Sequence, residues 1–101
     1  MATDLLILRD KIDAIDKQIV SLYTERMEVC KEVAEFKIET GKKVFDKVRE
    51  AEKIEKVKGM VDSDFHRHAV QELFEQIMSS SRKLQYKMLA EQGVVEKEDM
   101  E

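Results

Sequence analysis

The 101-residue sequence contains no proline and no tryptophan, and it has a single cysteine, Cys30. Without proline no residue forces a helix to break, and with one cysteine no disulfide can form within the chain. The N-terminus lacks the apolar core and small-residue cleavage site of a signal peptide, and no apolar run approaches membrane-spanning length. These absences predict a cytoplasmic protein that does not enter a membrane.

Aromatic side chains are also scarce, and the sequence has no excess of positive charge. Aromatic residues make up 6% of the sequence and the formal net charge is −4, so nucleic acid is not expected as a partner. Residues 93–101 contain four acids and one lysine, which leaves a net charge of only −1 for the rest. This distribution predicts one domain over residues 1–92, followed by a frayed acidic tail over residues 93–101.

What the sequence does contain is typical of helices. Hydrophobic residues make up 43% and charged residues 40%, with many strong helix formers among them. Apolar residues recur at spacings of three and four from Leu5 to Phe36, and Arg26 is the one polar member of this series. With a cap at residue 3 or 4 and Gly41 at the end, the pattern predicts a first helix from about residue 5 to 39.

The first helix is too long for one compact domain. At about 1.5 Å per residue it spans roughly 50 Å, whereas a compact domain of 100 residues has a radius of gyration of about 13 Å. Two shorter helices from the same chain cannot cover its whole apolar stripe, so the stripe predicts a second copy of the protein. We therefore expect a homodimer built along this helix.

Two further helices are predicted. Residues 40–46 (TGKKVFD) indicate a loop in which Gly41 supplies a left-handed turn and Asp46 caps a second helix over about residues 47 to 59. Residues 62–65 (DSDF) offer three capping residues for a third helix that extends to about residue 91. The predicted fold class is all-α, with a long first helix, a short second helix and a third of medium length.

Arg26 needs an explanation because its position favours an apolar side chain. In a heptad that begins at residue 5, it falls at the buried position a. A charge buried without a partner costs several kcal/mol, so a facing anion is required. Glu25 and Glu32 fall at position g, whereas Arg9 and Lys37 share position e on the other side of the seam. An anion from outside the helix is therefore expected.

The spacing of these cations predicts a shared pocket. Arg26 and Lys37 lie about 16 Å apart along the helix axis, so two long side chains can clasp one small molecule. Arg9 lies about 25 Å from Arg26 and can complete the same site only from an antiparallel partner chain. The alternative is that Arg9 and Lys37 are solvated edge residues and that Arg26 sets the register of a coiled coil.

The third helix carries a second polar insertion. Ser81 and Gln85 stand four residues apart in its apolar series and project together. They form either a satisfied buried hydrogen-bond pair or a set of donors directed at a ligand. Cys30 is interpreted as a core or cavity-wall residue rather than a nucleophile, and His66 and His68 as surface residues. No spacing of potential ligands predicts a metal site.

These segments together resemble the all-helical class of chorismate mutases, over about residues 4–90. The resemblance is carried by LLILRDKIDAIDKQIVSLYTERMEVCKEVAEFK in the first helix, VFDKVRE in the loop and second helix, and SSSRKLQ in the third. It implies an intertwined homodimer of three-helix chains, and an isomerase that converts chorismate to prephenate in aromatic amino-acid biosynthesis. Because the sequence ends near residue 101, we expect this isomerase to be monofunctional. The implied rearrangement needs no nucleophile, metal or cofactor.

The resemblance also implies roles for the polar residues of the first and third helices. Arg9 is similar to the arginine that crosses from the other subunit, and Arg26 to the arginine that grips a substrate carboxylate. Lys37 resembles the lysine that contacts a carboxylate and the ether oxygen. Ser81 matches a carboxylate contact, and Gln85 matches the second donor to the ether oxygen. The catalytic residues implied are Lys37, Gln85 and Arg26.

The loop and the second helix supply the remaining residues of the implied site. Asp46, Arg49 and Glu50 occupy the positions that surround the substrate's ring hydroxyl in the family, and Glu50 is expected to contact it directly. The loop departs from the family pattern, because Lys43 stands where a proline is common and Phe45 where a polar residue is common. These departures predict a looser loop and a weaker hold on the substrate.

Two alternatives remain open from the sequence. Isochorismate pyruvate lyases are similar in fold and use much the same polar residues on a closely related substrate. The other alternative is a non-catalytic helical dimerisation module, in which Arg26 only sets the register of the paired helices. It predicts that Arg26→Leu stabilises the protein and that no small dianion raises its melting temperature.

Overall fold

The computed structural model describes residues 4–96, and this part of the chain folds into three helices without a strand. Helix α1 spans Leu5–Thr40, α2 spans Lys47–Lys58 and α3 spans Asp64–Glu91. Their lengths are 36, 12 and 28 residues. The all-α prediction is confirmed, together with the predicted order of a long, a short and a medium helix.

Short polar side chains start each helix, as the capping pattern predicts. Asp4, Asp46 and Ser63 have extended backbones, and each side-chain oxygen accepts a hydrogen bond from a first-turn N–H at 2.9, 3.0 and 3.1 Å respectively. Gly41 ends α1 with φ of 76°, the left-handed conformation that favours glycine. The caps therefore determine where the loop after α1 begins and ends.

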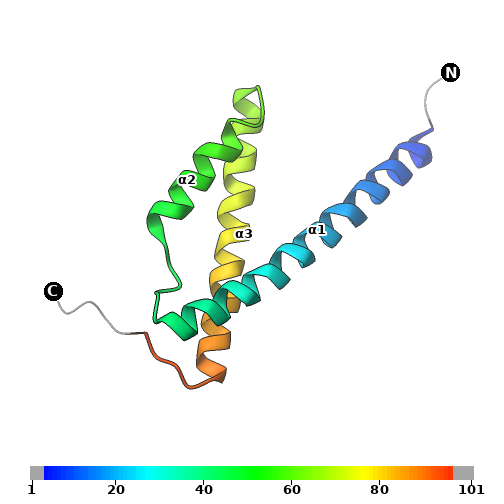
Figure 1. Ribbon diagram of the computed structural model, residues 1–101. Helices are drawn as coiled ribbons and strands as arrows, with labels where there is room; N and C mark the ends of the chain where they lie inside the picture. The colour runs from blue at the N-terminus through cyan, green and yellow to red at the C-terminus, as the bar shows by residue number, and fades with distance from the viewer. Residues whose placement is uncertain (1–3, 97–101) are drawn as a thin grey trace.

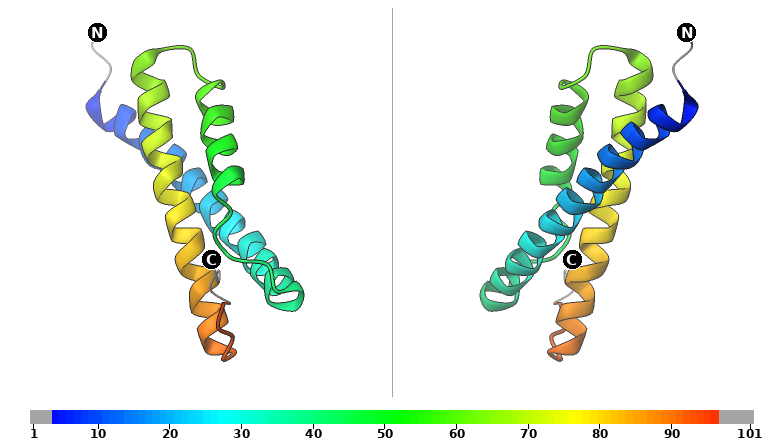
Figure 2. Two further views of the ribbon diagram at one scale, coloured as in Figure 1. Left: turned by 90° about the vertical axis from the view of Figure 1, so that its left-hand side faces the viewer. Right: turned by 90° about the vertical axis from the view of Figure 1, so that its right-hand side faces the viewer.

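Helix α3 is the centre of the fold. It runs antiparallel to α2 as a hairpin and also crosses α1, whereas α1 and α2 make no direct backbone contact along their lengths (Figure 1). The crossing uses the C-terminal half of α1, and the N-terminal half projects away from the hairpin (Figures 1 and 2). The radius of gyration is 18.0 Å, well above the roughly 13 Å of a compact chain of this length.

The buried core of the single chain is small. Every residue from 4 to 25 is exposed. The apolar stripe of α1 is open to solvent even near the crossing, with Leu22 63% exposed and Val29 53% exposed. One chain therefore leaves much of its longest apolar surface uncovered. The buried apolar residues are Ala34, Val44, Val57, Met78 and Leu89.

Helix α1 has two distinct faces rather than one stripe. Arg26, Cys30, Ala34 and Lys37 are half-buried or buried, and they follow one another at spacings of three and four toward the α2–α3 hairpin. The predicted apolar stripe lies beside this face and remains exposed. Arg26 belongs to both, because it also falls at position a of that stripe. The face of α1 that packs within the chain is thus the one that carries Arg26, Cys30, Ala34 and Lys37.

The segment after α3 turns back toward the loop that follows α1. Gly93 adopts a φ of 70°, and the Glu96 carboxylate accepts a hydrogen bond of 2.6 Å from the backbone N–H of Val44. The predicted frayed tail covered residues 93–101, of which residues 97–101 lie outside the described part. Between residues 4 and 96, no helix is both long and apolar enough to cross a membrane.

Candidate functional site

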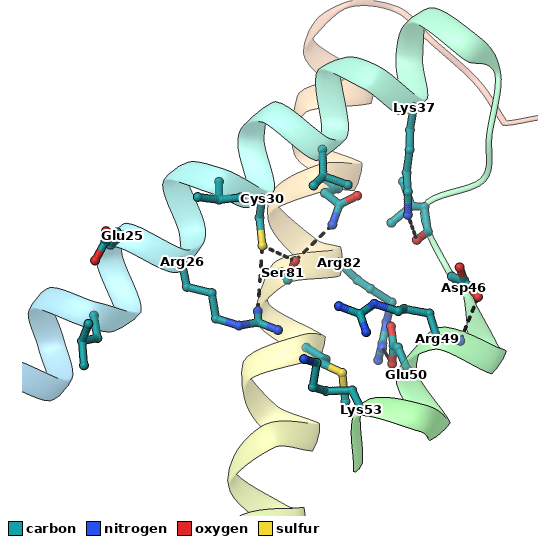
Figure 3. Close-up of a pocket in the computed structure, with 16 residues that line it drawn as sticks. Glu25, Arg26, Cys30, Lys37, Asp46, Arg49, Glu50, Lys53, Ser81 and Arg82 are labelled. Carbon is teal, nitrogen blue, oxygen red and sulfur yellow. Dashed lines mark hydrogen bonds and ion pairs between the residues drawn. The ribbon is translucent and has the colours of Figure 1, made fainter. Parts of the chain in front are cut away.

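A pocket of about 530 Å³ lies where α1, the following loop, α2 and α3 converge (Figure 3). This volume suits a small organic molecule. Of the eight residues predicted for the site, the structure brings seven together on its walls. They are Arg26, Lys37, Asp46, Arg49, Glu50, Ser81 and Gln85.

Arg9 is the predicted site residue that does not line the pocket. It is exposed on the N-terminal half of α1, and about 25 Å of helix separates it from Arg26. No rotation of its own side chain spans that distance. Arg9 can therefore act at this pocket only when it is supplied by another chain.

Helix α1 supplies two cations to the pocket from positions eleven residues apart. The Arg26 guanidinium lies 3.9 Å from the Cys30 sulfur, one helical turn along. Among residues 4–96, no carboxylate pairs with it, and an external anion stays a prediction. Lys37 donates a hydrogen bond of 2.7 Å from its ammonium to the carbonyl oxygen of Val44, which ties the loop to α1.

Ser81 and Gln85 form a hydrogen-bonded pair that is incompletely satisfied. Gln85 donates from Nε2 to the Ser81 hydroxyl at 3.0 Å, and that hydroxyl donates to the Cys30 sulfur at 3.0 Å. Gln85 is only 5% exposed, and within the described chain its Oε1 has no partner. A buried amide oxygen without a donor costs about 1–3 kcal/mol. The pair therefore retains unmet hydrogen-bonding capacity at the pocket wall.

Arg82 is a pocket residue that the sequence reading missed. Its guanidinium forms an ion pair with the Glu50 carboxylate, which links α3 to α2. The same guanidinium lies 5.0 Å from the centroid of the Phe45 ring, a distance typical of a cation–π contact. The signal was present, because Arg82 follows Met78 by four residues and precedes Gln85 by three.

The loop over residues 41–46 is held from three directions. Its Val44 carbonyl accepts from Lys37 of α1, and its Val44 N–H donates to Glu96 beyond α3. Phe45 stacks against Arg82 of α3. The sequence predicted a looser loop from Lys43 and Phe45. In the structure three contacts hold this loop, and Phe45 itself provides one of them.

Lys53 is the second pocket residue that the sequence reading missed. It follows Arg49 by one turn of α2 and lines the same pocket. Its burial, and the positive charges of Arg49, Lys56 and Arg26 around it, lower the pKa of its ammonium below the usual lysine value. This end of the pocket therefore carries more positive charge than the protein compensates.

The charges of the whole pocket point the same way. Of the three carboxylates on its walls, Asp46 accepts from the Arg49 N–H and Glu50 is paired with Arg82. Glu25, the third, is exposed. In the region that the structure describes, the remaining cations have no carboxylate partner, so the pocket is electropositive. The five cations on the walls are Arg26, Lys37, Arg49, Lys53 and Arg82.

Metal-ligating side chains do not gather in the described region. No three His, Cys, Asp or Glu side chains within residues 4–96 are arranged to hold a metal ion. His66 and His68 are exposed at the start of α3, in agreement with the surface interpretation. The fold and pocket together define an all-α protein with an electropositive pocket whose volume suits a small organic molecule.

The comparison with protein families identifies which class of helical protein this is. The family model described as chorismate mutase type II matches residues 8–86, most of the chain and all eight predicted site residues. The chain belongs to the chorismate mutase type II family, which is a family of isomerases. This membership supports chorismate mutase activity. A search of curated proteins found no match.

Proposed function

We propose that this protein converts chorismate to prephenate in aromatic amino-acid biosynthesis, at the pocket between its three helices. The observation that carries the proposal is the cluster of cations without carboxylate partners, beside Ser81 and Gln85, in a chain of the chorismate mutase family. Chorismate is a dianion of suitable size. Its two carboxylates supply the negative charge that the pocket lacks.

The rearrangement is unimolecular. The ether C–O bond breaks while a new C–C bond forms, and no proton, electron or group is exchanged with the protein. The protein therefore accelerates the reaction by holding the dianion in its compact reactive conformer, and by placing donors where negative charge grows on the ether oxygen. Both tasks require fixed hydrogen-bond donors rather than a nucleophile.

Arg26 and Ser81 hold the substrate carboxylates in this mechanism, with Arg9 supplied by the partner chain. Within residues 4–96, the Arg26 guanidinium hydrogen-bonds only to the Cys30 sulfur, at 3.9 Å, so its other donors are available to a carboxylate. The Ser81 hydroxyl also donates to the Cys30 sulfur. Sulfur is a weak acceptor, so a carboxylate oxygen readily replaces it.

Lys37 and Gln85 act on the ether oxygen. The Lys37 ammonium carries three N–H donors and uses one of them on the Val44 carbonyl, so it can donate to a ligand without releasing the loop. The Gln85 amide uses one N–H on Ser81 and keeps a second. Donors that strengthen as charge develops stabilise the transition state more than the bound substrate, which raises kcat.

Glu50 is proposed to accept a hydrogen bond from the ring hydroxyl. Its Oε1 is occupied by Arg82, which leaves Oε2 for the substrate. Asp46 is less suited to direct contact, because its carboxylate caps α2 through the N–H of Arg49. Asp46 and Arg49 then shape the loop and the start of α2 around the ring.

A homodimer completes the proposed site. The exposed apolar stripe on α1 needs a cover, and an antiparallel pairing of two α1 helices by a two-fold axis covers it on both chains at once. The same pairing carries Arg9 of one chain toward Arg26 of the other. This one arrangement would therefore account both for the length of α1 and for the distance of Arg9 from the pocket of its own chain.

The test is turnover of chorismate by wild-type protein, Arg26→Ala and Lys31→Ala. Lys31 is an exposed control on the same helix. We expect prephenate from the wild type, a loss of about 10²–10³-fold in kcat/KM for Arg26→Ala, and wild-type rates for Lys31→Ala. Loss of chorismate absorbance gives the rate, and chromatography identifies the product.

The same assay separates the alternatives. Pyruvate released from isochorismate, without prephenate from chorismate, would make the protein a lyase. Turnover of neither substrate, with no rise in melting temperature on adding either, would leave a helical dimerisation module. In that case Arg26→Leu should stabilise the protein, because an apolar side chain suits position a better than an unpaired charge.

A further inference from the structure

Lys53 has no assigned role, although it stands on the wall of the pocket. It belongs to α2, is half-buried and follows Arg49 by one turn, so both project from the same face of that helix. In the described part of the chain, its ammonium has neither a hydrogen bond nor an ion pair. A half-buried cation without a partner is unusual, because burial of an uncompensated charge is unfavourable.

The neighbours of Lys53 increase this cost. Arg49 on its own helix and Arg26 on α1 both lie close enough to repel it. Glu50 is the nearest pocket carboxylate in sequence, but it is already paired with Arg82. Three positive charges therefore gather at one end of the pocket, and within residues 4–96 none of the three forms an ion pair with a carboxylate.

We propose that Lys53 is a further substrate-binding residue, whose ammonium shares with Arg26 one carboxylate of the bound dianion. Figure 3 shows the Arg26 and Lys53 side chains reaching toward the same part of the pocket from α1 and α2. An anion placed between them removes their mutual repulsion and compensates both charges. The inference rests on the proposed function, because it takes chorismate as the dianion.

This role predicts an effect on KM rather than on kcat. The carboxylate charge that Lys53 neutralises is the same in the substrate and in the transition state, so its contribution to binding is uniform. Lys37 differs, because the charge on the ether oxygen grows during the reaction. We expect Lys53→Met to raise KM roughly 10-fold, the size of one charged hydrogen bond, and to change kcat by less than about twofold.

The role also predicts opposite effects on the free and the bound protein. Removing Lys53 relieves repulsion from Arg26 and Arg49, so the ligand-free Lys53→Met protein should melt at a higher temperature than the wild type. The additional rise on saturating it with chorismate should be smaller than in the wild type. A lysine with a purely structural role would lower the melting temperature of the free protein instead.

The experiment compares the wild type, Lys53→Met, Lys53→Arg and Lys56→Met in the chorismate assay and in thermal melts. Lys56 is exposed on the same helix and outside the pocket, so its removal controls for a change of charge on α2. Lys53→Arg should recover most of the wild-type KM, and Lys56→Met should keep it. If Lys53→Met fails to fold, Lys53→Gln replaces it, since glutamine removes the charge but keeps a polar end group.

The outcomes separate this inference from the proposed function. Turnover by the wild type with an unchanged KM in Lys53→Met contradicts the role of Lys53 alone. A large loss of kcat with an unchanged KM contradicts it too, because it would place Lys53 among the groups that act on the transition state. Absence of chorismate turnover in the wild type overturns the proposed function, and the role of Lys53 with it.

Discussion

The two halves of α1 differ in what their own chain provides. The C-terminal half crosses α3, buries Ala34 and carries Arg26 and Lys37 into a pocket. The N-terminal half is as regular a helix, yet every residue from 4 to 25 is exposed. Within residues 4–96, no part of the chain covers its apolar stripe, and Arg9 does not reach the pocket. The C-terminal half of α1 thus packs within the fold, whereas the N-terminal half is the part assigned to the interface in the dimer proposed above.

The largest effect is expected from a charge placed on the exposed half. Ile12→Glu should abolish dimerisation and nearly all activity, because a carboxylate would have to be buried in an apolar interface that also delivers Arg9. Light scattering gives the oligomeric state and the chorismate assay gives the rate. Asp13→Lys is the matched control, since it changes charge beside the stripe and not on it. A dimeric, active Ile12→Glu protein would contradict the proposed interface.

The C-terminal half of α1, which lines the pocket, can be probed through Cys30, the single cysteine of the sequence. Cys30 is half-exposed and lies beside Arg26 and Ser81, so a bound substrate should shield its sulfur. We expect saturating chorismate to slow alkylation of Cys30 by iodoacetamide roughly 10-fold, and full alkylation to block turnover. Mass spectrometry follows the modification. Equal alkylation rates with and without chorismate would place the substrate elsewhere.

A smaller effect is expected where the end of the described chain meets the loop. Glu96→Gln should raise KM by about two- to threefold, because the Val44 N–H loses a charged acceptor and the loop is held less firmly. Steady-state kinetics measure the change, and Glu91→Gln on α3 is the control. The loop would retain Lys37 and Phe45 as tethers. An unchanged KM would mean that these two contacts suffice.

The smallest effect concerns pH. Gln85 is an amide and donates without first binding a proton, so kcat should stay nearly level from about pH 5 to 8. A pH profile of kcat under saturating chorismate measures this. If kcat fell steeply across that range with the profile of a carboxylic acid, a titrating acid rather than Gln85 would be donating the hydrogen bond to the ether oxygen.

Much of the fold could be predicted from the sequence because its signals are local. Both ends of α1 and the start of α2 follow from Asp4, Gly41 and Asp46, which act on backbone groups within a few residues of themselves. Arg26 and Gln85 stand out because each interrupts an apolar series. Such features depend on helical periodicity alone, and the structure agrees with them.

Other features depend on how the helices cross, and periodicity does not contain that information. Arg82 matters because α2 places Glu50 opposite it, and Lys53 because α1 brings Arg26 close. The hydrogen bond between Val44 and Glu96 joins residues separated by 52 positions. Sequence spacing within one helix cannot reveal such partners. For the same reason, the sequence does not show which face of α1 packs against the α2–α3 hairpin, because that depends on the angle at which α1 crosses α3.

The central claim is that the two halves of α1 build one site across two chains. Arg9→Ala and Arg26→Ala proteins, each nearly inactive alone, are unfolded together, refolded as a mixture and assayed with chorismate. Each mixed dimer then holds one intact site, so random pairing should recover about a quarter of wild-type activity. Activity no higher than that of either variant alone would contradict the shared site.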